Sequence, residues 1–250
     1  MMGKRVLVGL CLLTFLLLIS CMGEDAGLIN YHRVGVVRET PIQCIYTSDD
    51  EGNIYVVSSS DFENRTDLED GDCCSVDFKT SFTDMLADGV YDADIFSYDT
   101  VPVCPLYDEL TDTSVIVTNE RLVTLYFDKS IYLEGRFFLE TKHKNHQEDQ
   151  TDIMNLSYDP EEGAEEDEDG ERVYNLYLRV AQEGGTGDST TYIRTTAFTI
   201  ADFLDQAKEI EDLAGLDRIN FRIKYPTGFN ADTTACVWGS TDMFTLLFTD

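Results

Sequence analysis

The chain has 250 residues, of which 18 are Lys or Arg and 48 are Asp or Glu, so its formal net charge is −30. Nucleic-acid phosphates and anionic lipid headgroups repel a chain this acidic, which excludes DNA and RNA binding. Hydrophobic residues make up 43% of the chain, with 14 Phe and 13 Tyr, which is enough for a packed core and excludes a disordered chain.

The N-terminus has the parts of a secretory signal peptide. Lys4 and Arg5 precede an apolar run of 14 residues over 6–19, and the small Ser20 follows the run. This run is shorter than the roughly 20 residues that a transmembrane helix needs. We therefore expect residues 1–20 to be removed, which leaves a chain with a formal charge of −32, because the removed part holds two basic residues and no acidic residue.

Residues 18–21 read Leu-Ile-Ser-Cys, which resembles the lipobox of bacterial lipoproteins. The resemblance implies that Cys21 is lipidated, that cleavage occurs before it, and that residues 21–33 form a lipidated tether. The alternative is an ordinary signal peptide with a cysteine at its end. Glu24 and Asp25 resemble the surface-export signal of some lipoproteins. We therefore predict a protein anchored through Cys21 in the outer membrane of a Gram-negative bacterium and exposed at the surface.

The first part of the chain is typical of short strands. Residues 42–57 predict a hairpin around the turn-forming 49–53, and apolar residues alternate with polar ones over 73–82 and again over 90–98. Five short strands in about 70 residues predict a small OB-like β-barrel domain over 34–106. Pro102 and Pro105 are expected to end it, because proline cannot donate to a strand ladder.

The remaining residues, 107–250, predict a β-sandwich domain. Its expected strands cover 122–127, 136–140, 153–158, 174–180, 192–200, 219–225 and 244–248. One helix is expected over 202–213, with Phe203, Ala207, Ile210 and Leu213 on its buried face, Gly215 ending it, and the end of the sandwich beneath it. The predicted fold class is mainly β: a small OB-like β-barrel followed by a β-sandwich with one short helix.

Five cysteines remain beyond the predicted anchor: Cys44, Cys73, Cys74, Cys104 and Cys236. The envelope permits disulfides, so a bridge from Cys44 to Cys73 or Cys74 is one interpretation, and buried reduced thiols are the other. Since adjacent residues of a strand point to opposite faces, we expect only one of Cys73 and Cys74 in the core.

Two polar segments invite a metal site. Residues 159–171 hold nine acidic residues in thirteen, and Glu165, Asp167 and Asp169 have the spacing of a calcium loop, but Leu176 stands where the final carboxylate belongs. We expect a mobile, solvated loop. His143 and His146, followed by Asp152, could share a metal, but the segment is typical of a turn, which holds ligands loosely. No metal ligand, catalytic residue or cofactor is predicted.

Trp238 is the one tryptophan and a candidate for stacking a ligand, because envelope proteins that bind glycans stack sugars on exposed aromatic rings. The alternative places Trp238 in the core. With three histidines and no nucleophile motif in the sequence, we do not expect an enzyme.

Several short segments together resemble the NigD-like lipoproteins. They are Glu69-Asp70-Gly71-Asp72 leading into Val76-Asp77-Phe78, then Asp88-Gly89 and Tyr91-Asp92-Ala93-Asp94-Ile95, with residues 122–127, 174–179 and 218–225 fitting the sandwich strands. The resemblance implies an OB-like barrel before a β-sandwich, and it carries over no catalytic residue. We expect a non-enzymatic binding or structural module with a protein, peptide or glycan partner. Surface capture of a glycan or nutrient is an alternative, and a hydrolase with paired carboxylates is a further one.

Overall fold

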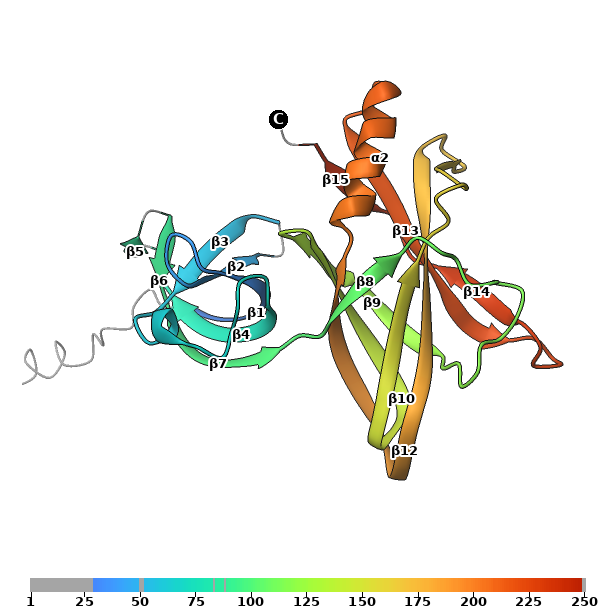
Figure 1. Cartoon of the computed structure of the whole chain (residues 1–250), viewed down its shortest axis with the longest axis horizontal. Helices are drawn as coiled ribbons and strands as arrows, with labels where there is room; N and C mark the ends of the chain where they lie inside the picture. The colour runs from blue at the N-terminus through green and yellow to red at the C-terminus, as the bar shows by residue number, and fades with distance from the viewer. Residues whose placement is uncertain (1–28, 50–51, 83, 88, 249–250) are drawn as a thin grey trace, which may run out of the picture.

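The computed structural model describes residues 29–49, 52–82, 84–87 and 89–248. Within these residues the chain has two mixed β-sheets and a single α-helix, which confirms the predicted mainly β fold class (Figure 1). The predicted signal peptide and Cys21 lie outside the described residues. No helix among the described residues is long and apolar enough to cross a membrane.

The first sheet has seven strands in the order β5-β6-β3-β2-β1-β4-β7. A short 3-10 helix, η1 (Phe62–Asn64), lies between β3 and β4 in the chain. The strands are β1 (Ile29–Arg38), β2 (Cys44–Ser48), β3 (Ile54–Ser58), β4 (Cys73–Thr80), β5 (Met85–Ala87), β6 (Val90–Asp92) and β7 (Asp94–Thr100).

The first sheet closes on itself. Only Ala93 separates β6 from β7, and β6 pairs with β3 while β7 pairs with β4. Since β4 also pairs with β1, β1 with β2 and β2 with β3, the pairings run from β6 round to β7, which continues from β6 in the chain, and the sheet curls into a small barrel. Its core contains the inward residues of the alternating strands, among them Val37, Ile45, Val76 and Phe78.

Gly35 marks a close approach between β1 and β2. A Cβ on Gly35 would lie 2.7 Å from the carbonyl oxygen of Tyr46 and would also overlap the Ile45 side chain. We expect Gly35→Ala to lower the free energy of unfolding by about 3 kcal/mol, because backbone cannot move aside cheaply. Urea unfolding would measure this loss. Gly228→Ala is the matched control in a strand, since its Cβ would meet Val237 at an ordinary 4.0 Å; an equal loss in both variants would contradict the prediction.

The second sheet has the order β14-β13-β12-β8-β10-β9, with β11 pairing β12 and β15 pairing β13. Its strands are β8 (Val103–Tyr107), β9 (Val123–Leu133), β10 (Arg136–Ser157), β11 (Glu165–Glu166), β12 (Arg172–Thr199), β13 (Arg218–Phe229), β14 (Cys236–Ser240) and β15 (Phe244–Leu247).

Strands β10 and β12 form one long antiparallel ribbon that doubles back on itself. They pair from Arg136 opposite Thr199 to Ser157 opposite Tyr177. Strand β8 pairs with β12 near Ala197 and with β10 near Leu156, so the two ends of the ribbon lie beside each other. The ribbon therefore has a first limb (136–146 with 190–199) and a second limb (150–157 with 177–184), and it projects from the body at its bend (Figure 1).

The bend forms where the backbone departs from regular strand geometry. The pairing of β10 with β12 shifts register between His143 and His146 and again between Gln147 and Glu148. Nearby Asn145 and Asp149 have positive φ, as do three glycines of β12 at positions 184, 185 and 187. Such residues tolerate the left-handed region, so they allow the ribbon to turn sharply.

The main core lies between the two limbs and is covered by the helix α2 (Ala201–Leu213). Its fully buried members include Phe137, Leu156, Leu176, Phe198 and Phe221. The helix adds Phe203, whose ring packs edge-on against Phe221 and Tyr174.

The helix itself was predicted within one residue, but its buried face was predicted wrongly. Phe203 and Ala207 are buried as expected, together with Glu211, whereas Ile210 is 47% and Leu213 91% exposed. Hydrogen bonds from Arg172 and Tyr174 to Glu211 hold this part of the helix, whereas Ile210 and Leu213 are exposed. Gly215 has a φ of 78°, and Leu216 N–H donates to the Glu211 carbonyl at 3.0 Å, so the predicted C-terminal stop is present.

The unit boundaries differ from those predicted. Strand β1 begins at Ile29, inside the expected tether, and β8 pairs with the second sheet although it was placed in the first domain. Pro102 was expected to block pairing, yet its carbonyl accepts a hydrogen bond from Ala197 N–H at 2.9 Å. Proline lacks a donor but keeps its acceptor, so the segment pairs with the second sheet, where β8 lies between β12 and β10.

The barrel and the second sheet pack together through a shared apolar cluster. Val36, Cys73 and Val101 of the first part of the chain contact Leu133, Phe138 and Ala197 of the second. The prediction that only one of Cys73 and Cys74 is buried in a core was wrong. Cys74 faces the barrel core and Cys73 faces the second sheet, so both are buried. The five described cysteines are free thiols.

The acidic segment 159–171 makes more contacts with the fold than expected. Glu165 and Glu166 form β11, and the Asp167 carboxylate accepts backbone N–H bonds from Asp169 and Glu171 at 2.9 and 2.8 Å. Glu165 also pairs with Arg222 of β13 at 2.8 Å. The sequence prediction overlooked the basic residues on β13, and Arg222 among them holds part of the segment against the sheet.

Candidate functional site

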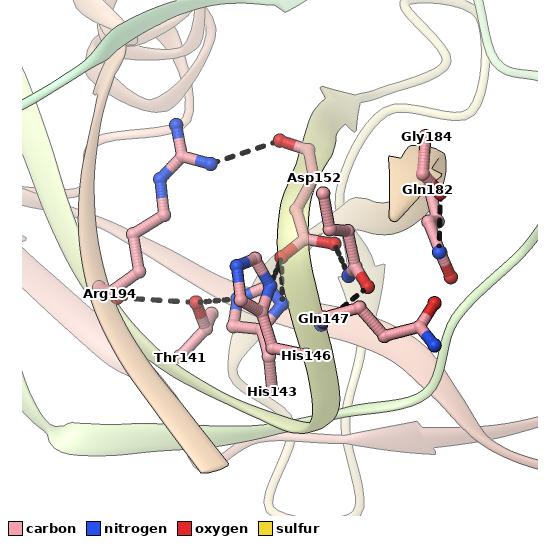
Figure 2. A network of polar contacts seen from close by, with 9 residues as sticks. Thr141, His143, His146, Gln147, Asp152, Gln182, Gly184 and Arg194 are labelled. Atoms are coloured by element: carbon pink, nitrogen blue, oxygen red, sulfur yellow. Dashed lines mark hydrogen bonds and ion pairs between the residues drawn. The ribbon is translucent and has the colours of Figure 1, made fainter. Parts of the chain in front are cut away.

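The space between the two limbs changes from apolar to polar toward the bend. Along β10, the inward residues run from Phe137 and Leu139 to Thr141 and His143, and all four are fully or almost fully buried. The second limb contributes Asp152, which is 3% exposed. Figure 2 shows these polar side chains meeting from both limbs. We call the residues Thr141, His143, His146, Gln150, Asp152 and Arg194 the polar layer.

The carboxylate of Asp152 is the centre of the polar layer. Its Oδ2 lies 3.0 Å from Nδ1 of His143 and 2.9 Å from Nδ1 of His146, and its Oδ1 accepts from the Gln150 amide at 2.5 Å. A carboxylate oxygen only accepts, so both histidines present a protonated Nδ1 to it. Two histidines that are separated by the start of the bend are therefore joined to the second limb through one oxygen.

Burial and bonding act in opposite directions on Asp152. Desolvation by burial is the largest effect and raises its pKa, but hydrogen bonds from His143 and Gln150 and the charges of the two histidines outweigh it. The net result lowers the pKa of Asp152 to about 2. The carboxylate is thus ionised at neutral pH and holds its partners strongly.

Strand β12 contributes Arg194 to the polar layer and Tyr192 beside it. Thr141 Oγ1 lies 2.8 Å from Nε2 of His143 and donates to the Arg194 carbonyl at 3.2 Å. The Arg194 guanidinium in turn donates to the Asp152 carbonyl at 3.0 Å. Tyr192, which is 42% exposed, stacks on the His146 ring with centroids 4.6 Å apart. The polar layer is therefore closed on its inner side and reaches solvent at Tyr192.

The arrangement is suited to holding the bend in one shape. An Asp–His contact of this kind also orients metal ligands and catalytic bases in proteins. Among the described residues, however, no group of three His, Cys, Asp or Glu side chains is arranged to hold a metal ion. The oxygens of Asp152 already accept three bonds within the fold. Within the fold, the polar layer connects the two limbs across the bend through hydrogen bonds and ion pairs.

Sequence reasoning found these histidines but misplaced them. They were assigned to a polar turn, whereas both lie in β10 and His143 is 3% exposed. The usable signal was the alternation Leu139, Thr141, His143, which continues the buried face of the strand. Asp152 was named beside them, yet its role depends on the bend, which local sequence does not reveal.

A second buried polar group lies beside the ribbon. Glu120 and Arg179 have almost no exposed side-chain surface and approach within 3.6 Å, and the Cys236 thiol donates to Glu120 at 3.2 Å. Burial, followed by the bond to Glu120, raises the pKa of Cys236 to about 11, so the thiol stays protonated and unreactive. A polar pocket of about 380 Å³ is lined by Glu120 of this pair and reaches Gln182.

Trp238 lies on β14, where its ring is partly covered. The indole N–H donates to the Thr113 carbonyl at 3.0 Å, and the Arg179 guanidinium lies over the ring at 5.2 Å. Tyr177 contacts it edge-on at 5.7 Å. These contacts occupy groups that a stacked ligand would use, and ligand stacking on Trp238 stays a prediction.

One constellation escaped the sequence analysis. Because β1 begins at Ile29, His32 lies in a strand, with its Nδ1 2.6 Å from Asp77 and its Nε2 3.3 Å from the Ser75 hydroxyl. The His32 side chain is 74% exposed on the outer barrel surface. A catalytic Ser–His–Asp system works inside a water-excluded site, so an exposed set of this kind is better suited to bridging the two strands β1 and β4 at the surface.

Comparison with known proteins finds similar folds and assigns no activity. No protein-family model matches the chain, and no curated protein matches it. An uncharacterized protein from Parabacteroides merdae has a similar structure, with a TM-score of 0.73, 22% identity, and coverage of 89% of this chain and 100% of that one. A putative lipoprotein from Bacteroides fragilis gives a TM-score of 0.51 at 10% identity, covering 88% of this chain and 99% of that one.

A NigD-like immunity protein from Bacteroides caccae also resembles the chain, with a TM-score of 0.49, 13% identity, and coverage of 88% of this chain and 97% of that one. At these identities the likeness concerns the fold.

Proposed function

We propose that the protein is a lipid-anchored envelope protein with a non-enzymatic binding role, and that the bend of its β10–β12 ribbon contacts the partner. The observation that carries this proposal is the polar layer, in which buried Asp152 fixes two histidines and so holds a projecting ribbon in one shape. A recognition element that is rigid before binding loses less entropy when a partner is bound.

The surface of the bend supports the same role. Tyr192 and Ile193 are 42% and 51% exposed close to the polar layer, while the neighbouring backbone is tied into the ribbon. Tyrosine contributes a large contact area at low entropic cost, which suits it to binding surfaces. The polar layer uses its ionisable groups to hold structure, which favours binding over catalysis.

The membrane location in this proposal depends on lipid attachment at Cys21. The Leu-Ile-Ser-Cys segment supports it, and a putative lipoprotein is among the similar structures. Cys21→Ala is expected to abolish incorporation of labelled fatty acid and to move the protein from the membrane fraction to the soluble one. Cys11→Ala is the matched control, because Cys11 leaves with the signal peptide. Labelling that persists in Cys21→Ala would refute the anchor.

We place the anchored protein at the outer face of an outer membrane. Protease treatment of intact cells tests this, with a periplasmic protein as the integrity control. Digestion of the protein while the control survives is the expected result. Survival of both proteins would place it in the periplasm instead.

Contact through the bend is tested by photo-crosslinking in cells. A photoreactive residue at exposed Thr191 is expected to form a discrete adduct, whereas one at exposed Asp232, on the far loop before β14, is not. Loss of the adduct in an Ile193→Ser background would tie it to the surface of the bend. The absence of any adduct at Thr191, or the same adduct at Asp232, would contradict the proposed role of the bend.

A further inference from the structure

The barrel carries an exposed aromatic ring that its fold does not need. Phe96 of β7 is 59% exposed, whereas its neighbours Ile95 and Tyr98 both pack against the barrel core. Strict alternation cannot place residues three apart on one face. The pairing of β4 with β7 shifts register here: Ser97 lies opposite Asp77 and Ile95 opposite Phe78, which leaves Phe96 between them without a partner. This is a β-bulge, a device that redirects a side chain at the expense of a ladder pairing.

Phe96 lines a pocket with residues of the loop after β3. The pocket has a volume of about 380 Å³, and its other lining residues include Asp61, Arg65, Ser97 and Tyr98. Asp61 is exposed, and its carboxylate makes no hydrogen bond or ion pair with the part of the chain that the structure describes. The pocket thus offers one free aromatic ring and one free carboxylate.

The same pocket contains the guanidinium of Arg65, which contacts an aromatic ring and a carboxylate as a bound cation would. Arg65 lies 5.0 Å from the centroid of the Tyr98 ring and makes two bonds to Asp67, at 2.7 and 2.8 Å. An aromatic ring and a carboxylate together bind a cation, and here Asp67 neutralises Arg65. Arg65 therefore adds little repulsion toward a second cation in the pocket.

We infer that the Phe96 pocket binds an arginine or lysine side chain of a basic peptide or protein, with the cation over the Phe96 ring and paired with Asp61. The net charge of −30 attracts such a partner over a distance and opposes anionic ligands. A neutral sugar could also lie on an aromatic ring, but it would gain nothing from Asp61 as an ion or from the charge of the chain. This binding site is on the barrel and is independent of the ribbon bend.

The test is titration of the purified protein with Ac-Gly-Arg-Gly-NH2, with backbone NMR chemical shifts as the readout. The matched probe replaces arginine with citrulline, which has nearly the same shape and no charge. We expect saturable shifts around Phe96 and Asp61 with the arginine peptide, binding that weakens as salt rises, and little response to the citrulline peptide. Phe96→Ala and Asp61→Asn should each weaken binding about fivefold.

Two control variants separate the pocket from general effects. Ile54→Ala removes an equally exposed apolar side chain of the same barrel, and Asp188→Asn removes an exposed carboxylate at the ribbon bend. Both should bind the arginine peptide as the unmodified chain does, and all four variants should melt at similar temperatures. Equal binding of both peptides, shifts away from the pocket, or a response of the pocket to maltose in place of the arginine peptide would overturn the inference.

Discussion

Asp152→Ala is expected to lower the free energy of unfolding by about 4 kcal/mol, because it removes the acceptor shared by buried His143 and half-buried His146. His143 is 3% exposed and cannot exchange its lost partner for water. The Gln150 amide, which donates to Asp152 at 2.5 Å, also loses its acceptor. Chemical unfolding monitored by circular dichroism would measure the loss, and hydrogen exchange should show it first in the residues of the bend.

The control for Asp152→Ala is Asp188→Ala, which removes an exposed carboxylate from the same bend. Its effect should stay within about 0.5 kcal/mol. Asp152→Asn is the second informative variant, since it keeps the shape and one acceptor while losing the charge, and it should fall between the other two. If Asp152→Ala unfolds at the same denaturant concentration as Asp188→Ala, the polar layer does not hold the ribbon.

The contribution of Asp152 is expected to depend on acid in a defined window. Its pKa is lowered in the folded chain to about 2, so folding favours the ionised form. Its stabilisation is therefore complete above the unfolded pKa, near 4, and is lost as pH falls through about 2. The difference in unfolding free energy between the unmodified chain and Asp152→Asn should shrink across this window. A difference that is constant from neutral pH to pH 2 would show that charge is not the cause.

Local patterns predicted the elements better than they predicted which faces are covered. The alternation over 73–82 placed β4 correctly, because one face of that strand forms the barrel core. The same rule failed for Cys73, because the outer face of the strand end is covered by Phe138 and Ala197 of the second sheet. Burial by a distant segment leaves no periodic trace in the covered strand.

The candidate site was predictable in composition and not in geometry. His143, His146 and Asp152 lie within ten residues, so sequence reasoning could group them. Their meeting depends on a bend that needs positive φ at Asn145 and Asp149 and at three glycines more than thirty residues later. The Phe96 pocket was missed for a related reason, since a bulge is defined by the partner strand and not by the strand that carries it.

The face of the helix α2 shows how a buried charge can replace an apolar contact. Helical spacing predicted Ile210 toward the core, but the turn is fixed by Glu211, which is 1% exposed. Arg172 grips its carboxylate with two bonds of 2.9 and 3.0 Å, and the Tyr174 hydroxyl donates to it at 2.7 Å. Burial acts to raise the pKa of Glu211, but these bonds lower it overall, so the carboxylate remains ionised at neutral pH.

Glu211→Ala is therefore expected to cost about 3 kcal/mol, because buried Tyr174 and half-buried Arg172 would both lose their acceptor. The matched control is Glu209→Ala on the exposed side of the same helix, for which a change within about 0.5 kcal/mol is expected. Hydrogen exchange of the helix amides gives a local readout, since α2 should open more readily than the barrel in Glu211→Ala. Equal stability of the two variants, or faster exchange spread evenly over barrel and helix, would show that apolar packing around Phe203 alone holds α2 in place.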